Sequence, residues 1–251
     1  GEITLAYRKK LSDLSVNRKS EKDLITEADI AVEEYLVGAI RDRYPDHAIT
    51  GEETGDHAGG EYRWIIDPID GTGSFVHGQP MYAVSIAVAR SGQTVLGVVD
   101  IPVMGQQFFA ARDAGAFCNG ERIGVSRRKR LVDCMLATGF ACLRSDMAYN
   151  NLSFFVDIAP RVRDIRRYGS AAADLCYVAA GLLDGFWELN LKEVDVAAGA
   201  LIVQEAGGRV TDFAGTAAGI PGEVVATNTL IHDRLVACLA AVKSRGETQS
   251  T

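Results

Sequence analysis

Apolar residues recur with helical spacing in several stretches of this chain. In TEADIAVEEYLVGAIRDRYP they stand at positions 28, 31, 32, 35, 36, 39 and 40, which is the stripe of an amphipathic helix. Thr26 is placed to cap this helix, and Pro45 ends the pattern. Similar patterns predict further helices over 147–160, 170–183, 195–208 and 230–243.

Short apolar or alternating runs predict strands between these helices. In the first half, AITGEE and YRWIID are two such runs, and a hairpin turns at Ser91-Gly92 between 82–90 and 94–101. QQFFAARD and AFCNGERIGVS continue this sheet, with a tight turn at Asn119-Gly120. In the second half, strands alternate with helices and are expected over 135–140, 184–191, 209–213 and 223–228.

The whole pattern indicates layered helices and sheets, an α+β architecture. We expect a single domain over residues 1–251, with a sheet-rich, antiparallel first half to about 130 and an α/β second half from about 131 to 245. Only the tail after Lys243 is expected to be disordered.

Composition narrows the class of protein. Hydrophobic residues make up 47%, but no apolar run approaches the roughly 20 residues of a membrane span. The net charge of −7 argues against a nucleic-acid partner, and RRKR at 127–130 is interpreted as a solvated turn. The cysteines show no C-x-x-C spacing, which predicts reduced thiols in a cytoplasmic protein. The opening GEITLAYRKK resembles the middle of a helix, so a removed targeting segment stays possible.

The segment WIIDPIDGTGSF carries the strongest chemical signal. Asp67 and Asp70 follow a buried strand so closely that they repel unless a cation lies between them or one is protonated. GTGS lacks the lysine of a P-loop, and Val76 replaces the third glycine of a dinucleotide fingerprint. If a helix begins here, Gly71 and Thr72 offer backbone N–H groups to a phosphate. Hard oxygen ligands beside anion donors suit magnesium-bound phosphate.

Two further acidic clusters end apolar elements. GEE offers Glu52 and Glu53, and VDVAAG places Asp195 before an apolar helix. Each has an ordinary explanation: a solvated loop for GEE, a helix N-cap for Asp195, and a proline-stabilised Asp turn for Asp67 and Asp70. Together these explanations are less attractive, because all the carboxylates lie at ends of apolar elements.

WIIDPIDGTGSF and VDVAAGALIVQEAGG resemble the two signature segments of the inositol monophosphatase family, which contains magnesium-dependent, lithium-sensitive phosphatases. DLITEAD, GAFCNGERIGVS and YGSAAADLCYVAAGLLDGFWE extend the resemblance almost from end to end. The resemblance implies a layered αβαβα sandwich, two or three Mg²⁺ ions at each site and a homodimer. It implies a phosphomonoesterase that attacks its substrate with a metal-activated water, without membrane or nucleic-acid partners.

The resemblance also implies roles for individual residues. The implied metal ligands are Glu52, Asp67, the Ile69 carbonyl, Asp70 and Asp195. The implied catalytic residues are Glu52, Thr72, which helps to activate the water, and Asp29, which orients Thr72. The implied substrate contacts are Asp70, Gly71, Thr72, Gly169, Ser170, Ala171, Glu188 and Asp195. Residues 19–23 fall in a mobile loop that closes over the site.

The substrate stays open in this resemblance. Gly73-Ser74 replaces the usual Thr-Asn, and Val194 replaces the tryptophan often found before the last aspartate. Inositol monophosphate is the first substrate to consider, with histidinol phosphate and fructose-1,6-bisphosphate as alternatives. A catalytically inactive binding or regulatory protein is a further alternative, opposed by the intact acidic ligands and Thr72. Arg167 and Tyr168 are candidate substrate contacts, whereas Trp187 and the four histidines are expected to be structural or exposed.

Overall fold

The structure is a computed structural model, and it describes residues 1–217 and 220–248. Its α-helices are α1 (Glu2–Arg8), α2 (Glu27–Arg43), α3 (Thr72–Val76), α4 (Ala141–Arg144), α5 (Leu152–Ile158), α6 (Ala171–Ala179), α7 (Glu193–Glu205) and α8 (His232–Thr248). Short 3-10 turns are η1 (Leu11–Asp13), η2 (Pro102–Met104), η3 (Leu131–Asp133) and η4 (Ala159–Arg161). None of the helices within the described residues combines the length and apolar character needed to span a membrane.

The strands form a hairpin and two larger sheets. The hairpin pairs β1 (Val16–Arg18) with β2 (Leu24–Thr26). The larger sheet has eight strands, in the order β10 (Glu121–Arg122), β9 (Gly115–Cys118), β8 (Gln106–Ala111), β7 (Gln93–Ile101), β6 (Ala83–Arg90), β5 (Tyr62–Asp70), β3 (Ala48–Gly51) and β4 (Gly55–His57). The smaller has five, in the order β12 (Asp164–Arg166), β11 (Met135–Thr138), β13 (Gly185–Leu189), β15 (Glu223–Thr227) and β14 (Arg209–Thr211).

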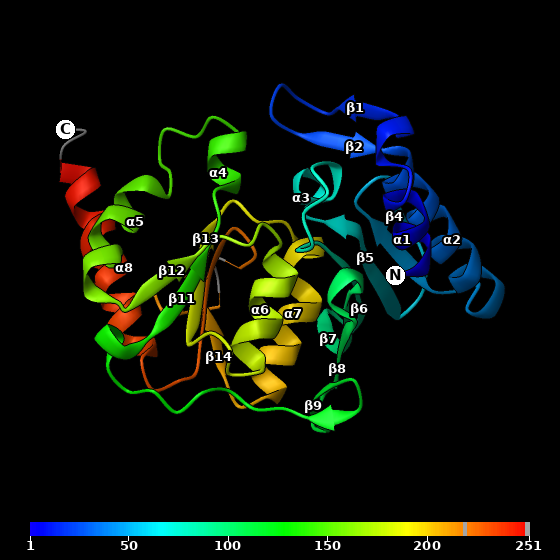
Figure 1. The fold of residues 1–251 in the computed structure, drawn as a ribbon. Coiled ribbons are helices and arrows are strands. Elements are labelled where there is room, and N and C mark those ends of the chain that lie inside the picture. The colour runs from blue at the N-terminus through cyan, green and yellow to red at the C-terminus, as the bar shows by residue number, and fades with distance from the viewer. Residues whose placement is uncertain (218–219, 249–251) are drawn as a thin grey trace.

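Helices and sheets alternate in layers (Figure 1). Helices α1 and α2 cover the outer face of the eight-stranded sheet, α6 and α7 lie between the two sheets, and α5 and α8 cover the far face of the five-stranded sheet. This is the layered αβαβα sandwich expected from the sequence. The predicted antiparallel meander holds from β5 to β10, but β3 runs parallel to β5.

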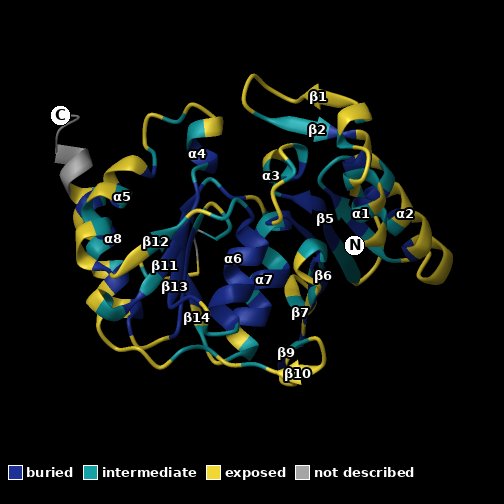
Figure 2. Cartoon of the chain, viewed as in Figure 1, coloured by how far each residue is buried: buried dark blue, intermediate teal, exposed yellow. Residues whose placement is uncertain are grey.

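The inner helix layer explains the strongest apolar patterns of the sequence. Every residue of α6 is buried, and α7 buries most of its length against β6 and β7 (Figure 2). A helix covered by sheets on both sides has no solvated face, so its sequence is apolar all round. The ends of the elements that carry the acidic motifs meet above this layer, between the β1–β2 hairpin and α4 (Figure 1).

Helix α2 begins where the sequence predicts, but its buried face differs from the apolar stripe. Thr26 caps the helix and forms a capping box with Asp29. Tyr35, expected on the buried stripe, is 64% exposed, whereas Asp29 and Glu33 are 0% exposed. The stripe prediction was wrong at these positions because the two acids, one turn apart, form polar contacts inside the protein: Asp29 with Thr26 and Thr72, and Glu33 with the loop after β3.

Several predicted boundaries in the second half were also wrong. The helix predicted over 147–160 is reduced to α5, and α4 was not predicted. Helix α6 ends at Ala179 rather than 183, because Gly181 adopts a φ of +70°. Helix α8 continues past Lys243 to Thr248, so the predicted disordered tail is helical there; residues 249–251 lie outside the described residues.

Candidate metal and phosphate site

The site is centred on the end of strand β5. Asp67 is 1% exposed and its Oδ1 accepts a hydrogen bond from the Ile69 N–H at 3.0 Å, so the ordinary Asp turn is present as well. Gly71 follows with φ +96° and caps α3, the helix start anticipated in the sequence. A Cβ on Gly71 would lie 2.8 Å from the Gly169 carbonyl oxygen. Glycine therefore lets β5 turn into α3 and approach the Gly169 loop closely.

Asp70 joins this turn to the second half of the chain. Its Oδ2 accepts hydrogen bonds from the Ser170 hydroxyl at 2.7 Å and from the Ala172 N–H at 2.6 Å. Ser170 is also the N-cap of α6, where its hydroxyl accepts from the Ala173 N–H. The predicted substrate residues Gly169, Ser170 and Ala171 are thus brought against Asp70, and all three line one small cavity with it.

Asp195 completes a group of three carboxylates. It is the third residue of α7 rather than the N-cap, and its Oδ2 accepts a hydrogen bond from the Lys192 N–H at 2.7 Å. One carboxylate oxygen from each of Asp67, Asp70 and Asp195 lies within 4.8 Å of the others. We call these three residues the aspartate cluster; three hard oxygen donors this close together could hold a divalent metal ion.

Charge repulsion in the aspartate cluster is reflected in its pKa values. Burial, with the charges of Glu52 and Asp70, raises the pKa of Asp67 well above its usual range. Burial and the charge of Asp195 raise the pKa of Asp70 to about 8, and burial raises the pKa of Asp195. In the described part of the chain, no lysine or arginine side chain forms an ion pair with the cluster. The charged cluster is therefore unfavourable without a cation.

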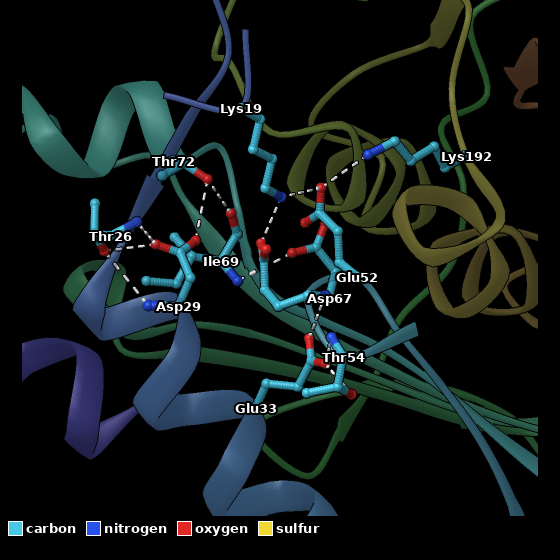
Figure 3. A network of polar contacts seen from close by, with 11 residues as sticks. Lys19, Thr26, Asp29, Glu33, Glu52, Thr54, Asp67, Ile69, Thr72 and Lys192 are labelled. Atoms are coloured by element: carbon cyan, nitrogen blue, oxygen red, sulfur yellow. Dashed lines mark hydrogen bonds and ion pairs between the residues drawn. The ribbon is translucent and has the colours of Figure 1, made fainter. Parts of the chain in front are cut away.

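Glu52 lies beside the cluster in a different environment (Figure 3). Its Oε1 lies 3.2 Å from the Lys19 Nζ and 3.0 Å from the Lys192 Nζ. Lys19 also lies 2.6 Å from Glu53 Oε1. Although burial acts in the opposite direction, the two lysines lower the pKa of Glu52. We call Lys19, Glu52, Glu53 and Lys192 the lysine–glutamate cluster; no motif of the sequence pointed to Lys192.

Thr72 and Asp29 meet although 43 residues separate them. The Thr72 hydroxyl lies 3.2 Å from Asp29 Oδ1 and 3.1 Å from the Ile69 carbonyl oxygen, and it can donate to either (Figure 3). The other oxygen of Asp29 accepts from the Thr26 N–H at 2.8 Å and from its hydroxyl at 2.5 Å. Burial raises the pKa of Asp29. The start of α2 therefore holds Asp29 in place to orient Thr72.

Glu33 is a second acid on α2 that sequence reasoning missed. Its carboxylate accepts from the Glu53 N–H at 3.0 Å, and from the N–H and hydroxyl of Thr54 at 2.7 and 2.6 Å (Figure 3). It thereby fixes the loop after β3 that presents Glu52. The signal that could have identified Glu33 is its spacing of four residues from Asp29, which places both acidic side chains on the same face of the helix.

Glu188, near the end of β13, lines the same small cavity as Asp70 and Asp195. It is 5% exposed, its Oε1 accepts from the Ala141 N–H at 3.0 Å, and burial raises its pKa to about 7. A Cβ on Gly139 would lie 2.1 Å from Glu188 Oε2, so glycine leaves space for this carboxylate. Asp174, also buried beside this cavity, has an Oδ1 without a hydrogen-bond partner among the described residues.

A larger pocket of about 380 Å³ opens next to these groups. The turn between β1 and β2 contributes Lys19 and Lys22 to its lining, α4 contributes Arg144, and Glu52 and Asp195 line it as well. Arg144 and Asp195 line the small Glu188 cavity too, so the two spaces adjoin. The other charged residues of the lining are Lys192, Glu21, Asp23 and Asp146, so the pocket combines cationic and acidic side chains and meets the aspartate cluster at Asp195.

The other residues considered in the sequence lie either at the Glu188 cavity or in the packed interior of the protein. Arg167 lines the Glu188 cavity, whereas Tyr168 packs edge-on against Tyr177, with ring centroids 5.7 Å apart. Trp187 is 0% exposed and its indole N–H donates to Asn151, as expected of a core residue. Two histidines are structural: His47 stacks on aromatic rings, and His232 is buried between threonine hydroxyls.

The two departures from the inositol pattern lie near the site without entering the aspartate cluster. Val194 is 5% exposed and packs in the main core, while its carbonyl accepts from the Ser85 hydroxyl at 3.3 Å. The Ser74 hydroxyl lies 3.5 Å from the Tyr168 carbonyl oxygen, which links α3 to the loop before α6.

Comparison with known proteins gives consistent matches over nearly the whole chain. Residues 1–244 match the model of the inositol monophosphatase family. The chain is 46% identical to Nus factor SuhB of Pseudomonas aeruginosa over 91% of this chain and 87% of that protein. It is 40% identical to an inositol-1-monophosphatase of Mesorhizobium japonicum, over 93% and 88%. The crystal structure of extragenic suppressor protein suhB from Bartonella henselae matches with a TM-score of 0.90 and 38% identity, over 95% and 93%.

Proposed function

Because the chain belongs to the inositol monophosphatase family and is a phosphoric monoester hydrolase, we propose that it is a Mg²⁺-dependent phosphatase of small polyol or sugar phosphates, with inositol monophosphate as the first candidate. The observation that carries the proposal is the aspartate cluster, whose carboxylate oxygens lie within 4.8 Å of one another. Their raised pKa values, and the absence of a paired cation among the described residues, support a site built for divalent ions.

We assign the metal ligands to Glu52, Asp67, Asp70, Asp195 and the Ile69 carbonyl, holding two or three ions. Bound Mg²⁺ would polarise the phosphoryl oxygens and activate a water for attack. Phosphate monoesters hydrolyse very slowly in water, so catalysis needs strong charge stabilisation. The acidic donors supply groups for the ions, and basic side chains of the pocket, such as Arg144 and Lys192, supply groups for the ester.

The other residues are assigned to proton handling and substrate positioning. Thr72, held by Asp29, is placed to take part in proton transfer from the attacking water. Thr72 is also the first residue of α3, where backbone N–H groups have no partner inside the helix and can bind phosphate oxygens. Glu188 and the Gly169–Ala171 segment are assigned to the alcohol part of the substrate, because they line one small cavity together with Asp70 and Asp195.

Phosphate release from a panel of esters tests this function. We expect turnover of inositol monophosphate that disappears with a chelator and returns with Mg²⁺. Greater turnover of histidinol phosphate or fructose-1,6-bisphosphate would keep the chemistry and change the substrate. Turnover that persists in excess chelator, or no turnover of any ester with Mg²⁺, would contradict the proposal.

Three further properties remain predictions. Lithium should inhibit by occupying a magnesium position while product phosphate is bound, which predicts uncompetitive inhibition. A homodimer is expected in solution. Nucleic acid and membranes are not expected as partners, in keeping with the net charge of −7.

A further inference from the structure

Two ammonium groups meet on one oxygen of Glu52. Lys19 and Lys192 approach Oε1 from opposite sides, at 3.2 and 3.0 Å (Figure 3). Lys19 is also tied to Glu53 at 2.6 Å, so it has two carboxylates to neutralise. Lys192 has no second carboxylate at ion-pair distance among the described residues. Glu52 is thus the shared anchor of two like charges, which repel each other.

Lys192 is the less constrained of the two. Its side chain is 60% exposed, against 26% for Lys19. Its backbone is fixed, because the Lys192 N–H donates to Asp195 Oδ2 at 2.7 Å at the start of α7. The ammonium can therefore leave Glu52 by side-chain rotation alone, without moving the carboxylate of Asp195 or the helix.

Resting on the proposed function, we propose that the Lys192 ammonium is an internal counter-ion of Glu52 that competes with Mg²⁺ and, once released, binds the anionic part of the substrate. Further positive charge beside Glu52 repels both ammonium groups, and the exposed Lys192 yields first. Lys192 lines the 380 Å³ pocket together with Glu52 and Asp195. The released ammonium therefore stays in a pocket that borders the aspartate cluster at Asp195, within reach of an anion bound beside the metal ions.

The test is Lys192→Met, which keeps the length of the side chain and removes its charge. By isothermal titration calorimetry of the full chain, Mg²⁺ without phosphate should bind about two- to fivefold more tightly, the size expected for loss of a partly exposed ion pair. Inorganic phosphate, titrated at saturating Mg²⁺, should bind about three- to tenfold more weakly, because a charged contact is lost. A merely structural role of Lys192 would not move the two affinities in opposite directions.

Lys22→Met is the matched control. Lys22 lines the same pocket but bonds Asp146 and the Leu143 carbonyl instead of Glu52. Its loss should leave the Mg²⁺ affinity within about twofold of the original. Lys192→Arg, which retains the charge, should preserve both affinities more closely than Lys192→Met.

The possible results are distinct. Unchanged or weaker Mg²⁺ binding by Lys192→Met overturns the competition, and unchanged phosphate binding overturns the substrate contact. If the unaltered protein binds no Mg²⁺, this inference and the proposed metal dependence both fail. If it binds Mg²⁺ and phosphate but hydrolyses no ester, the proposed function fails while the opposite shifts in affinity still support the role of Lys192.

Discussion

The aspartate cluster and the lysine–glutamate cluster lie side by side but solve the problem of buried negative charge in different ways. Among the described residues, Asp67, Asp70 and Asp195 have no paired cation, and their pKa values are raised. Glu52 has two lysines of its own, and its pKa is lowered. The chain therefore neutralises one group internally and leaves the other for an external cation.

This difference has opposite consequences for cation binding and for the stability of the fold. Bringing like charges together in a buried site is unfavourable, and the rest of the fold must compensate for it. A site that already contains its counter-ions contributes to stability but binds cations less readily. The contrast predicts which substitutions abolish metal binding, which slow the chemistry, and which change only stability or substrate preference.

The largest effect should come from Asp67→Asn, which removes the most buried charge of the aspartate cluster. Mg²⁺-dependent phosphate release should fall below detection, because a central ligand is lost. The metal-free protein should unfold at a temperature a few degrees higher, since repulsion is relieved and an asparagine oxygen still accepts from the Ile69 N–H. Calorimetric Mg²⁺ binding and thermal unfolding measure both effects.

The exposed Asp42 on α2 offers a control, because Asp42→Asn changes the net charge equally and should leave Mg²⁺ binding intact. A lower unfolding temperature for metal-free Asp67→Asn would show that charge repulsion in the aspartate cluster does not destabilise the fold. The contrast with Glu52 would then be wrong.

The next effect concerns chemistry rather than metal. Thr72→Ala should lower kcat by about 10²–10⁴-fold, the usual loss for a positioned proton-transfer group. The Mg²⁺ affinity should change little, because Thr72 is not one of the assigned metal ligands and its hydroxyl can donate to Asp29 instead of the Ile69 carbonyl. Thr72→Ser keeps the hydroxyl and should recover much of the rate. A nearly normal kcat for the alanine variant would remove Thr72 from the reaction.

Some of the features behind these predictions could be predicted from the sequence, and others could not. The helix over residues 27–43, the strand that ends in Asp67 and the turn at Gly71 follow from local patterns of apolar residues, caps and glycine. The predicted ligands Asp67, Asp70 and Asp195 lie together in the structure. Their grouping was implied by the family resemblance. Their spacing in the sequence was also compatible with a simple Asp turn at Asp67 and Asp70 and a helix N-cap at Asp195.

The features that could not be predicted from the sequence depend on contacts between segments that are far apart in the chain. Lys192 reaches Glu52 across 140 positions, and no local pattern distinguishes it from an ordinary surface lysine. Short elements such as α4 and β12 have too few residues for a periodic signal and are stabilised by neighbours. The rotation of α2 was mispredicted for a related reason, since Asp29 and Glu33 are buried by polar contacts that hydrophobicity does not register.

The raised pKa values of the buried acids should also make the stability of the metal-free protein depend on pH. In the folded, metal-free protein the pKa of Asp70 is about 8 and that of Glu188 about 7, above the ordinary values of 3.8 and 4.5. The folded state then binds more protons than the unfolded state between these limits, so stability falls as pH rises from about 5 to about 8. A loss of a few kcal/mol would lower the unfolding temperature by roughly 5–10 °C.

Calorimetric scans without metal measure this slope, and saturating Mg²⁺ should flatten it by stabilising the charged carboxylates. Asp70→Asn should reduce the slope without metal. A constant unfolding temperature between pH 5 and 8 would mean that the carboxylates keep ordinary pKa values in the fold.

The smallest effect is expected for a substitution of Glu188, which belongs to neither cluster and is assigned to substrate recognition. Glu188→Gln retains an oxygen that can accept from the Ala141 N–H, so the fold should be preserved. The variant loses the charge that strengthens a hydrogen bond to a substrate hydroxyl, and kcat/KM for a polyol phosphate should fall about 3- to 10-fold. With p-nitrophenyl phosphate, which has no such hydroxyl, it should change less than about twofold. Equal losses with both substrates would place Glu188 in the hydrolytic machinery instead, and the division of the site into a metal side and a recognition side would fail.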